Sequence, residues 1–257
     1  MSNTVRYTAY KTIVSREITR FMRIWPQTIL PPAITMTLYF IIFGNLIGSR
    51  IGTMDGFSYM EFIVPGLIMM SVITSSYANV VSSFFSMKFQ HSIEEILIAP
   101  VPNYIILAGF VSGGVARGLM VGLIVSIISI IFTGLTINNY LITISVIVMT
   151  AILFSLAGMI NAVFARNFDD ISIIPTFVLT PLTYLGGVFY SIKLLPEFWQ
   201  SVSLSNPILH MVNALRYGVQ GQSDLQITYA LRIIFSFIIA LAGCTLYLLR
   251  KGVGIRS

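Results

Sequence analysis

The side chains that could do chemistry are few, and the densest group of them lies between His91 and Glu95. A nucleophile with its base would need a motif such as GxSxG, and a catalytic zinc one such as HExxH, and neither motif occurs. The second histidine, His210, is far along the chain, and the single cysteine, Cys244, falls in an apolar run. We therefore expect no catalytic residue, no metal site and no cofactor bound by this chain.

The same group has the pattern of a short helix. Ser92 precedes Glu95 by three residues, the spacing of a capping box, and Pro100 stops the helix about two turns later. Ile93 and Leu97 fall on one side at helical spacing. Because this segment is too short and too charged to span a bilayer, it is predicted to be a docking helix between two apolar segments.

Composition places the chain in a membrane. Of its 257 residues 56% are hydrophobic and only 9% are charged, and the mean hydropathy is +0.88. The net charge of +6 comes from basic residues at the ends of apolar segments rather than from one basic patch. The charge therefore indicates membrane topology, and no nucleic-acid partner is expected.

Apolar runs of sufficient length predict an all-α polytopic membrane protein with six transmembrane helices. Their approximate bounds are 27–47, 62–82, 119–135, 141–164, 171–190 and 228–249. The excess of Lys and Arg on one side predicts that both termini and the docking helix are cytoplasmic. We expect a single domain: a cytoplasmic interfacial helix in residues 1–26, a six-span bundle in 27–249 and a cytoplasmic tail in 250–257.

The N-terminal segment is predicted to be an amphipathic helix over residues 6–25. Its apolar stripe includes Phe21 and Trp25, while Arg16, Arg20 and Arg23 gather on the opposite side. Such a helix suits the plane of an anionic cytoplasmic leaflet, where the arginines would meet lipid headgroups. A simple flank of the first span is the alternative. Pro31 and Pro32 are expected at the first turn of that span or at the bend leading into it.

Two further features concern packing and the external side. The glycines between Gly109 and Gly118 are expected to let helices approach closely, and Arg117 to extend its guanidinium toward the cytoplasmic headgroups. Residues 191–223 alternate apolar pieces with Pro, Asn and Gly, which predicts two external re-entrant half-helices. There Lys193 and Arg216 are expected to reach water.

The sequence lacks an energy source of its own. No GxxxxGK[ST] phosphate-binding loop occurs, and the interiors of the spans are almost free of acidic residues. A membrane subunit driven by a separate ATPase is therefore favoured. An ion-coupled secondary exporter or lipid carrier working without an ATPase is one alternative, and a membrane scaffold without transport is another.

Two stretches carry a family resemblance: HSIEEILIAPVP at residues 91–102, and TPLTYLGGVFYSIKLLPEFWQSVSLSNPILHMVNALRYG at residues 180–218. With them, the chain resembles the permease subunits of bacterial ABC-2-type exporters over nearly its whole length. The resemblance implies a homodimer in the bacterial inner membrane with two copies of an ABC ATPase subunit on the cytoplasmic face. ATP and Mg would bind to that ATPase. The substrate would be a drug, lipid or glycan.

The resemblance also implies roles for particular residues. The coupling segment would enter a cleft of the ATPase, with the two glutamates meeting polar or basic groups and the aliphatic residues anchoring it. Its residues are His91, Ser92, Ile93, Glu94, Glu95, Leu97 and Pro100. Candidates for an external gate are Phe189, Tyr190 and Trp199, for which an ordinary place in the aromatic belt is the alternative.

Overall fold

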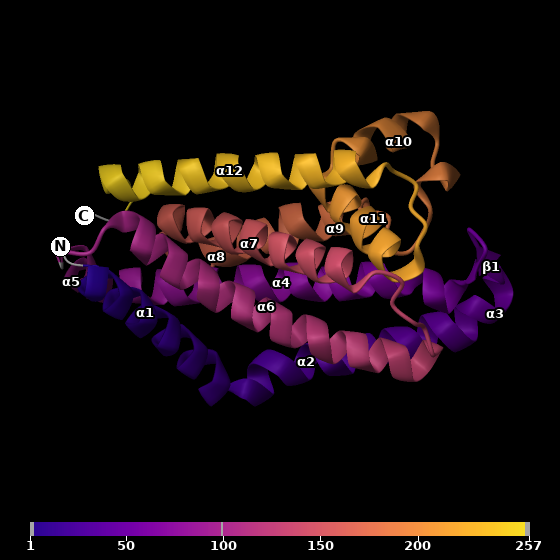
Figure 1. Ribbon diagram of the computed structural model, residues 1–257, viewed down its shortest axis with the longest axis horizontal. Coiled ribbons are helices and arrows are strands. Elements are labelled where there is room, and N and C mark those ends of the chain that lie inside the picture. Colours follow the sequence, from indigo (N-terminus) through magenta and orange to yellow (C-terminus); the bar gives the residue numbers. More distant parts are fainter. Residues whose placement is uncertain (1–2, 99, 255–257) are drawn as a thin grey trace.

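The computed structural model describes residues 3–98 and 100–254, with their side chains except those of residues 45, 46, 49 and 97. The long helices lie side by side along the long axis of Figure 1. In the described part of the chain, five helices are long and apolar enough to cross a membrane: Trp25–Gly44, Tyr59–Phe89, Asn103–Thr133, Tyr140–Phe164 and Ile227–Lys251. The predicted all-α polytopic membrane protein is confirmed.

The central helix of the bundle is α4 (Tyr59–Phe89), which packs against both α6 (Asn103–Thr133) and α7 (Tyr140–Phe164). Buried residues occur all around α4 and along most of its length, as expected for a helix that other helices surround. By contrast, α12 (Ile227–Lys251) leaves most of its apolar surface exposed. That surface suits contact with lipid.

Close packing of α6 depends on its glycines. A Cβ atom on Gly113 would lie 2.5 Å from the Cβ of Glu17 in α1 (Asn3–Arg23). A Cβ atom on Gly118 would overlap the hydroxyl of Ser76 in α4. The expected close approach of helices at these glycines is confirmed, because any larger residue would push α6 away from α1 and α4.

The chain enters its first span through a turn at Ile24, which separates α1 from α2 (Trp25–Tyr39). Figure 1 shows the two helices meeting at an angle at the edge of the bundle. The expectation for Pro31 and Pro32 was wrong, because both lie inside α2, beyond its first turn. The first turn is occupied by Pro26 instead, where a missing N–H leaves no hydrogen bond unmade.

Beyond α2 the helix continues as a π-helix and a short α-helix, and the chain then turns back through a hairpin. The segments are the π-helix η1 (Phe40–Ile47), α3 (Gly48–Ile51), and the antiparallel strands β1 (Thr53–Met54) and β2 (Phe57–Ser58). Directly after β2, the Ser58 hydroxyl accepts a hydrogen bond from Glu61 N, while the Glu61 carboxylate accepts one from Ser58 N. This capping box starts α4.

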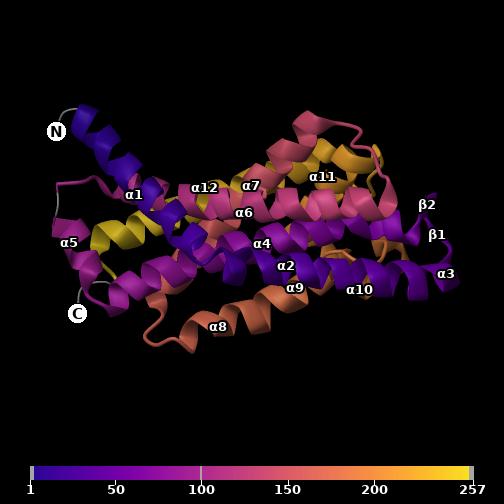
Figure 2. The ribbon, with the colours of Figure 1, turned by 90° about the horizontal axis from the view of Figure 1, so that it is seen from below.

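The predicted fifth span differs from expectation in length. It forms three consecutive five-residue segments: α8 (Asp170–Ile174), the π-helix η2 (Pro175–Leu179) and α9 (Thr180–Tyr184). Figure 2 shows this stretch along the outer edge of the bundle. It extends about 22 Å at 1.5 Å per residue, less than a hydrocarbon core of about 30 Å. The helix ends six residues before Tyr190 because Gly187 takes a positive φ of 69°. The sixth span therefore stays a prediction.

Between α9 and α12 the chain forms short helices, as the alternating pattern predicted. They are the 3₁₀ turn η3 (Ile192–Leu194), α10 (Glu197–Leu204) and α11 (Pro207–Gln220). Both α-helices are too short to cross a membrane. In Figure 1, α10 lies at the end of the bundle, while α11 packs against α4, α7 and α12. Their re-entrant insertion into the membrane stays a prediction.

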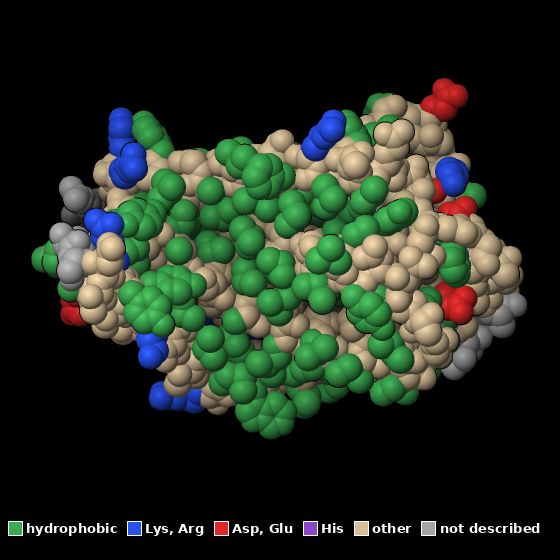
Figure 3. Space-filling model, in the orientation of Figure 1, with side chains coloured by type: hydrophobic (Ala, Val, Ile, Leu, Met, Phe, Trp, Pro, Cys, Tyr) green, Lys and Arg blue, Asp and Glu red, His purple; other side chains and the backbone are tan. Residues whose placement is uncertain are grey.

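The bundle has two distinct ends. Both ends of the described chain lie near the short helix α5 (Ser92–Ile98), and we call this the α5 end. The opposite end, which carries α10 and the β1–β2 hairpin, is the α10 end. Figure 3 shows charged side chains of both signs at the two ends, with Lys and Arg more numerous at the α5 end, and apolar side chains across most of the face between them. That distribution is typical of a membrane protein.

Candidate functional site

The predicted docking helix is α5, seven residues long, and it ends before Pro100 as expected. Its predicted capping box was wrong. Ser92 is already the first helical residue, and its hydroxyl donates a hydrogen bond back to the Met87 carbonyl at 3.2 Å. The reversal from α4 into α5 is made by His91, whose φ is +58°. The structure therefore fixes the start of α5 through a tight turn.

The side chains of α5 divide between the bundle and the surface. Ile93 is 1% exposed and belongs to the hydrophobic core, so it holds α5 on its own chain. Its expected role as an anchor inside a partner was wrong for that reason. Leu97, the other expected anchor, lies outside the described side chains. The apolar residue that α5 does present is Ile98, which is 84% exposed and was not predicted from the sequence.

The polar residues of this segment are mostly exposed at the surface. Glu94, Glu95 and Pro100 are exposed, and His91 Nδ1 lies 3.3 Å from the Glu94 carboxylate. The Ser92 hydroxyl points back to the backbone, away from that pair. In the described part of the chain, no three His, Cys, Asp or Glu side chains gather into a possible metal site.

The N-terminal helix α1 has three faces instead of the predicted two. Glu17 and Phe21 are buried against the bundle. Ile18 and Met22 recur at i and i+4, and both are exposed, as is Trp25 at the start of α2. The third face is basic. Only part of the expected apolar stripe therefore faces outward, because the rest covers α4 and α6.

Arg20 is not on the exposed face where the sequence placed it. Its guanidinium donates to the backbone carbonyl and the side-chain oxygen of Asn79 in α4, at 2.9 Å each, and lies 3.3 Å from the Glu17 carboxylate. The Ser83 hydroxyl donates to the other oxygen of Glu17 at 2.5 Å. The sequence signal for this polar contact was Glu17 itself, an acidic residue on an otherwise basic helix. Glu17 and Arg20 thus tie α1 to α4.

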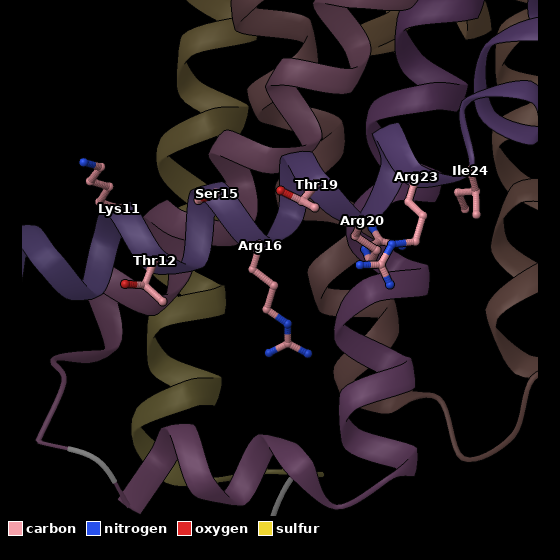
Figure 4. A pocket seen from close by; sticks show the side chains of 8 residues that line it. All are labelled: Lys11, Thr12, Ser15, Arg16, Thr19, Arg20, Arg23 and Ile24. Atoms are coloured by element: carbon pink, nitrogen blue, oxygen red, sulfur yellow. The ribbon is translucent and has the colours of Figure 1, made fainter.

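A basic hollow of about 750 Å³ lies along α1. Figure 4 shows Arg16 pointing away from α1 into the open space, with Arg20 and Arg23 farther along the helix. Hydroxyl side chains of Ser15 and Thr19 lie between these cations. The hollow can therefore bind anionic or strongly polar groups.

A second groove, of about 620 Å³, runs between α1 and α5. Its lining is mostly apolar and includes Ala9 and Ile13 of α1 with Ile96 of α5. Glu95 and Arg16 stand at its charged parts. The docking helix and the interfacial helix, far apart in the sequence, thus form one continuous surface at the α5 end.

The three gate candidates do not form one cluster. Phe189 packs against Tyr39, Phe43 and Tyr184, with ring centroids 5.4 to 6.0 Å apart. Trp199 lies in α10, is half-exposed and meets Phe198 edge to face. Among the described aromatic contacts, Phe189 and Trp199 do not meet. A gate that uses both therefore stays a prediction. Tyr190, the residue after Phe189, is half-buried.

A charged cluster at the α10 end was missed by the sequence analysis. The Asp224 carboxylate accepts from Lys193 Nζ at 2.7 Å and from the Ser191 hydroxyl at 3.3 Å, and lies 3.9 Å from the guanidinium of Arg216. Arg216 also donates to the Gly187 carbonyl and lies over the ring of Phe62. The expectation that Arg216 reaches water was wrong, because its side chain is 5% exposed.

Lys193 is the accessible member of this cluster, as expected, with a side chain 65% exposed. Its hydrogen bond to Asp224 and the charge of that carboxylate raise the pKa of Lys193 above its ordinary value. A polar cavity of about 150 Å³ adjoins the cluster and is lined by Asp55 and Gln222 as well. These contacts hold the segment from Gly187 to Lys193 against Arg216 of α11 and Asp224.

A third groove, of about 330 Å³, lies between α4 and the α8–α9 stretch. Apolar residues such as Met70 and Leu179 line it together with hydroxyls such as Thr74 and Thr183. The groove contains no charged side chain among its lining residues. It therefore suits an amphiphilic molecule better than an ion.

The geometry is that of a bundle of long apolar helices with exposed charged side chains at one end, and comparisons with known proteins identify its family. The profile described as ABC-2 type transporter matches residues 8–219. The chain is 59% identical over 251 residues, 98% of either protein, to the inner membrane transport permease YadH of Escherichia coli (strain K12). It is 23% identical over 203 residues, covering 79% of this chain and 78% of the relative, to nodulation protein J of Rhizobium leguminosarum bv. viciae. The chain therefore belongs to the ABC-2 type transporter family, as a multi-pass inner membrane subunit of an ABC transporter.

Proposed function

We propose that this chain forms the translocation path of an ATP-driven exporter and receives its energy from a separate ATPase subunit. The observation that carries the proposal is the surface at the α5 end. There α5 presents Glu94, Glu95 and Ile98 beside the basic face of α1. A short rigid helix held by buried Ile93 can transmit a push to α4, with which it is continuous through one turn.

Docking at this surface would couple nucleotide binding to the bundle. ATP and Mg are bound by the partner, and two ATPase copies serve a homodimer of this chain. The ATPase contributes apolar and basic groups toward α5 and acidic groups toward Arg16 and Arg23 of α1. Because Glu17 and Arg20 tie α1 to α4, a movement of either docking helix reaches the same central helix.

The proposed path runs along α4. The groove between α4 and the α8–α9 stretch opens to the side of the subunit and carries apolar and hydroxyl side chains. Two such grooves facing each other in a homodimer would enclose a path for an amphiphilic drug, a lipid or a glycan-type substrate. Phe189, which packs on Tyr39 and Phe43, would narrow its outer end. In this arrangement both termini are cytoplasmic.

The docking role is tested by reversing charge on α5. The double variant Glu94→Lys/Glu95→Lys is expressed together with the partner ATPase subunit, and the ATPase retained on washed membranes is measured. We expect retention and ATP-dependent transport to fall about tenfold or more, because like charges across an interface weaken association by several kcal/mol. Glu197→Lys in α10 is the matched control, since Glu197 is also exposed but lies at the opposite end.

The outcome is decided by comparing the two variants at equal amounts of folded protein. Unchanged ATPase retention and transport in the Glu94→Lys/Glu95→Lys variant would overturn the docking role of α5. Transport that persists in vesicles without any ATPase or ATP would overturn the ATP-driven function and favour an ion-coupled exporter.

A further inference from the structure

Arg117 is an arginine in α6 without a protein partner. Within the described residues, no hydrogen bond or ion pair reaches its guanidinium, and its Nε atom is buried and unpaired. Arg20 lies close enough to repel its charge. A positive charge in a transmembrane helix is normally paired or directed to a functional ligand, because an unpaired charge there costs several kcal/mol. The missing partner is the starting point of the inference.

Two other buried donors at the same place also lack acceptors. The side-chain nitrogen of Asn79 is unpaired although Asn79 is 0% exposed, and so is Nε of Arg20. The Asn79 nitrogen points toward α6, since it would lie 3.5 Å from a Cβ atom on Gly113, one helical turn before Arg117. All three orphan atoms are N–H donors. The buried hydroxyls of Ser76 and Ser155 are unpaired as well and lie against Gly118 and Gly114 of α6. What the described part of this junction of α1, α4 and α6 lacks is a second anionic acceptor for its N–H donors.

The charge at the junction is also incomplete. Arg20 and Arg117 carry two positive charges, and the nearby carboxylate is Glu17, whose oxygens already accept from Arg20 and Ser83. The helices that pack against α6 offer no second one: α2, α7 and α12 contain no Asp or Glu, and the only acid of α4 is Glu61 at its opposite end. One positive charge therefore remains unbalanced by the protein.

The depth of the junction matches the phosphate layer of a membrane. Asn79 lies 20 residues after the start of α4, which is about 30 Å at 1.5 Å per residue, the thickness of a hydrocarbon core. The count along α6 from Arg117 to Thr133 gives about 24 Å, so the Arg117 backbone lies about 6 Å inside that surface, a depth that its long side chain can span. On α1, Arg20 precedes the beginning of the first span at Trp25 by about one turn. All three helices place the orphan donors near one membrane surface, at the α5 end.

We propose that Arg117, Arg20 and Asn79 form a binding site for one phosphate group, supplied by a phospholipid of the leaflet at the α5 end. The phosphate balances the excess charge and accepts from the orphan donors, as arginine and phosphate groups commonly pair. Arg20 also lines the basic hollow, so a headgroup can reach the site from there. The lipid would bridge α1 and α6 at this junction. A movement of α1 caused by ATPase docking would pass to the other helices through the same junction.

The test measures lipid binding by the purified full-length chain. Native mass spectrometry counts retained phospholipid, and thermal unfolding is followed during titration with phosphatidylglycerol or with inorganic phosphate. We expect wild type to retain lipid, and Arg117→Gln to bind it about tenfold or more weakly. A response to phosphatidylglycerol alone identifies the lipid as the source, whereas an equal response to inorganic phosphate identifies a free-anion site of the same chemistry.

Two further variants keep the test decisive if Arg117→Gln fails to fold. Asn79→Asp preserves the acceptor for Arg20 and supplies the missing negative charge, so it should fold, lose the retained lipid and unfold at a temperature independent of phosphatidylglycerol. Arg232→Gln is the matched control, an exposed arginine near the start of α12 at the other end of the bundle, and should bind lipid like wild type. Wild-type lipid binding by Asn79→Asp, or an equal loss in Arg232→Gln, would overturn the site.

Discussion

Two groups of charged side chains, one at each end of the bundle, differ in how their charges are satisfied. At the α10 end, Asp224 and Arg216 are each 5% exposed and lie 3.9 Å apart. Asp224 also accepts hydrogen bonds from Lys193 and Ser191, and Arg216 donates one to the Gly187 carbonyl. At the α5 end, Glu94 and Glu95 are exposed, and Arg16 points into an open hollow. The Asp224 cluster satisfies its charges within the chain, while Glu94, Glu95 and Arg16 leave theirs available.

This difference separates two structural tasks. A buried pair costs desolvation and is kept where one geometry must be held, here the turn at Gly187 and the packing of α11 on α4. Exposed charges contribute little to the stability of the subunit alone, but they can contribute to the affinity and specificity of binding when a partner covers them. We therefore expect loss of the buried charges of the Asp224 cluster to affect folding, and changes to the exposed charges of α5 to affect assembly.

The largest expected effect comes from Asp224→Ala. The change leaves Arg216 buried without its carboxylate, and removing one member of a buried pair costs about 3–5 kcal/mol. Thermal unfolding of the purified chain should show a strongly lowered melting temperature. Asp55→Asn is the control, because Asp55 is 34% exposed and lies 4.0 Å from Lys193, so its loss should change the free energy of unfolding by less than about 1 kcal/mol. Equal melting temperatures for the two variants would break the contrast between the ends.

A smaller effect is expected when the aliphatic residues of α5 are shortened one at a time. Ile93→Ala empties a fully buried position and should lower the free energy of unfolding by about 2–4 kcal/mol. Ile98→Ala removes an exposed side chain and should change it by less than about 0.5 kcal/mol, while weakening ATPase retention on membranes. Unfolding curves and retention are measured on the same preparations. A loss of retention without a loss of stability in Ile93→Ala would contradict the division made by the structure.

Sequence patterns predicted the long helices well because each span depends on a local run of apolar residues. The bounds of α7 and α12 agree with those expected to within two residues. The stop of α5 before Pro100 is local too. By contrast, the capping box was assigned to Ser92 although the same spacing at Ser58 is the one that forms. The spacing of a capping box is therefore not sufficient to predict the first residue of a helix.

The polar contacts between helices could not be predicted from local sequence patterns. Arg20 was placed on an exposed face because α1 was treated as an isolated amphipathic helix, yet α4 offers it Asn79 some 59 residues away. Arg216 was expected in water because α11 is short, yet Asp224 and Gly187 fold around it. Ile93 was assigned to a partner because its own core was not visible in the sequence. In each of these errors the helix itself was predicted correctly. What was wrong was which of its surfaces another part of the chain covers.

The smallest expected effect sharpens the comparison within the α10 end itself. The raised pKa of Lys193 means that its charged form is favoured by folding, so its stabilising contribution is complete below the ordinary lysine pKa of about 10.5 and is lost as pH rises above it. Because the side chain is 65% exposed, the contribution is less than about 1 kcal/mol. Melting temperatures between pH 9 and about pH 11.5 should converge for wild type and Lys193→Gln. A difference that persists or widens at high pH would place the stabilising charge on another member of the cluster.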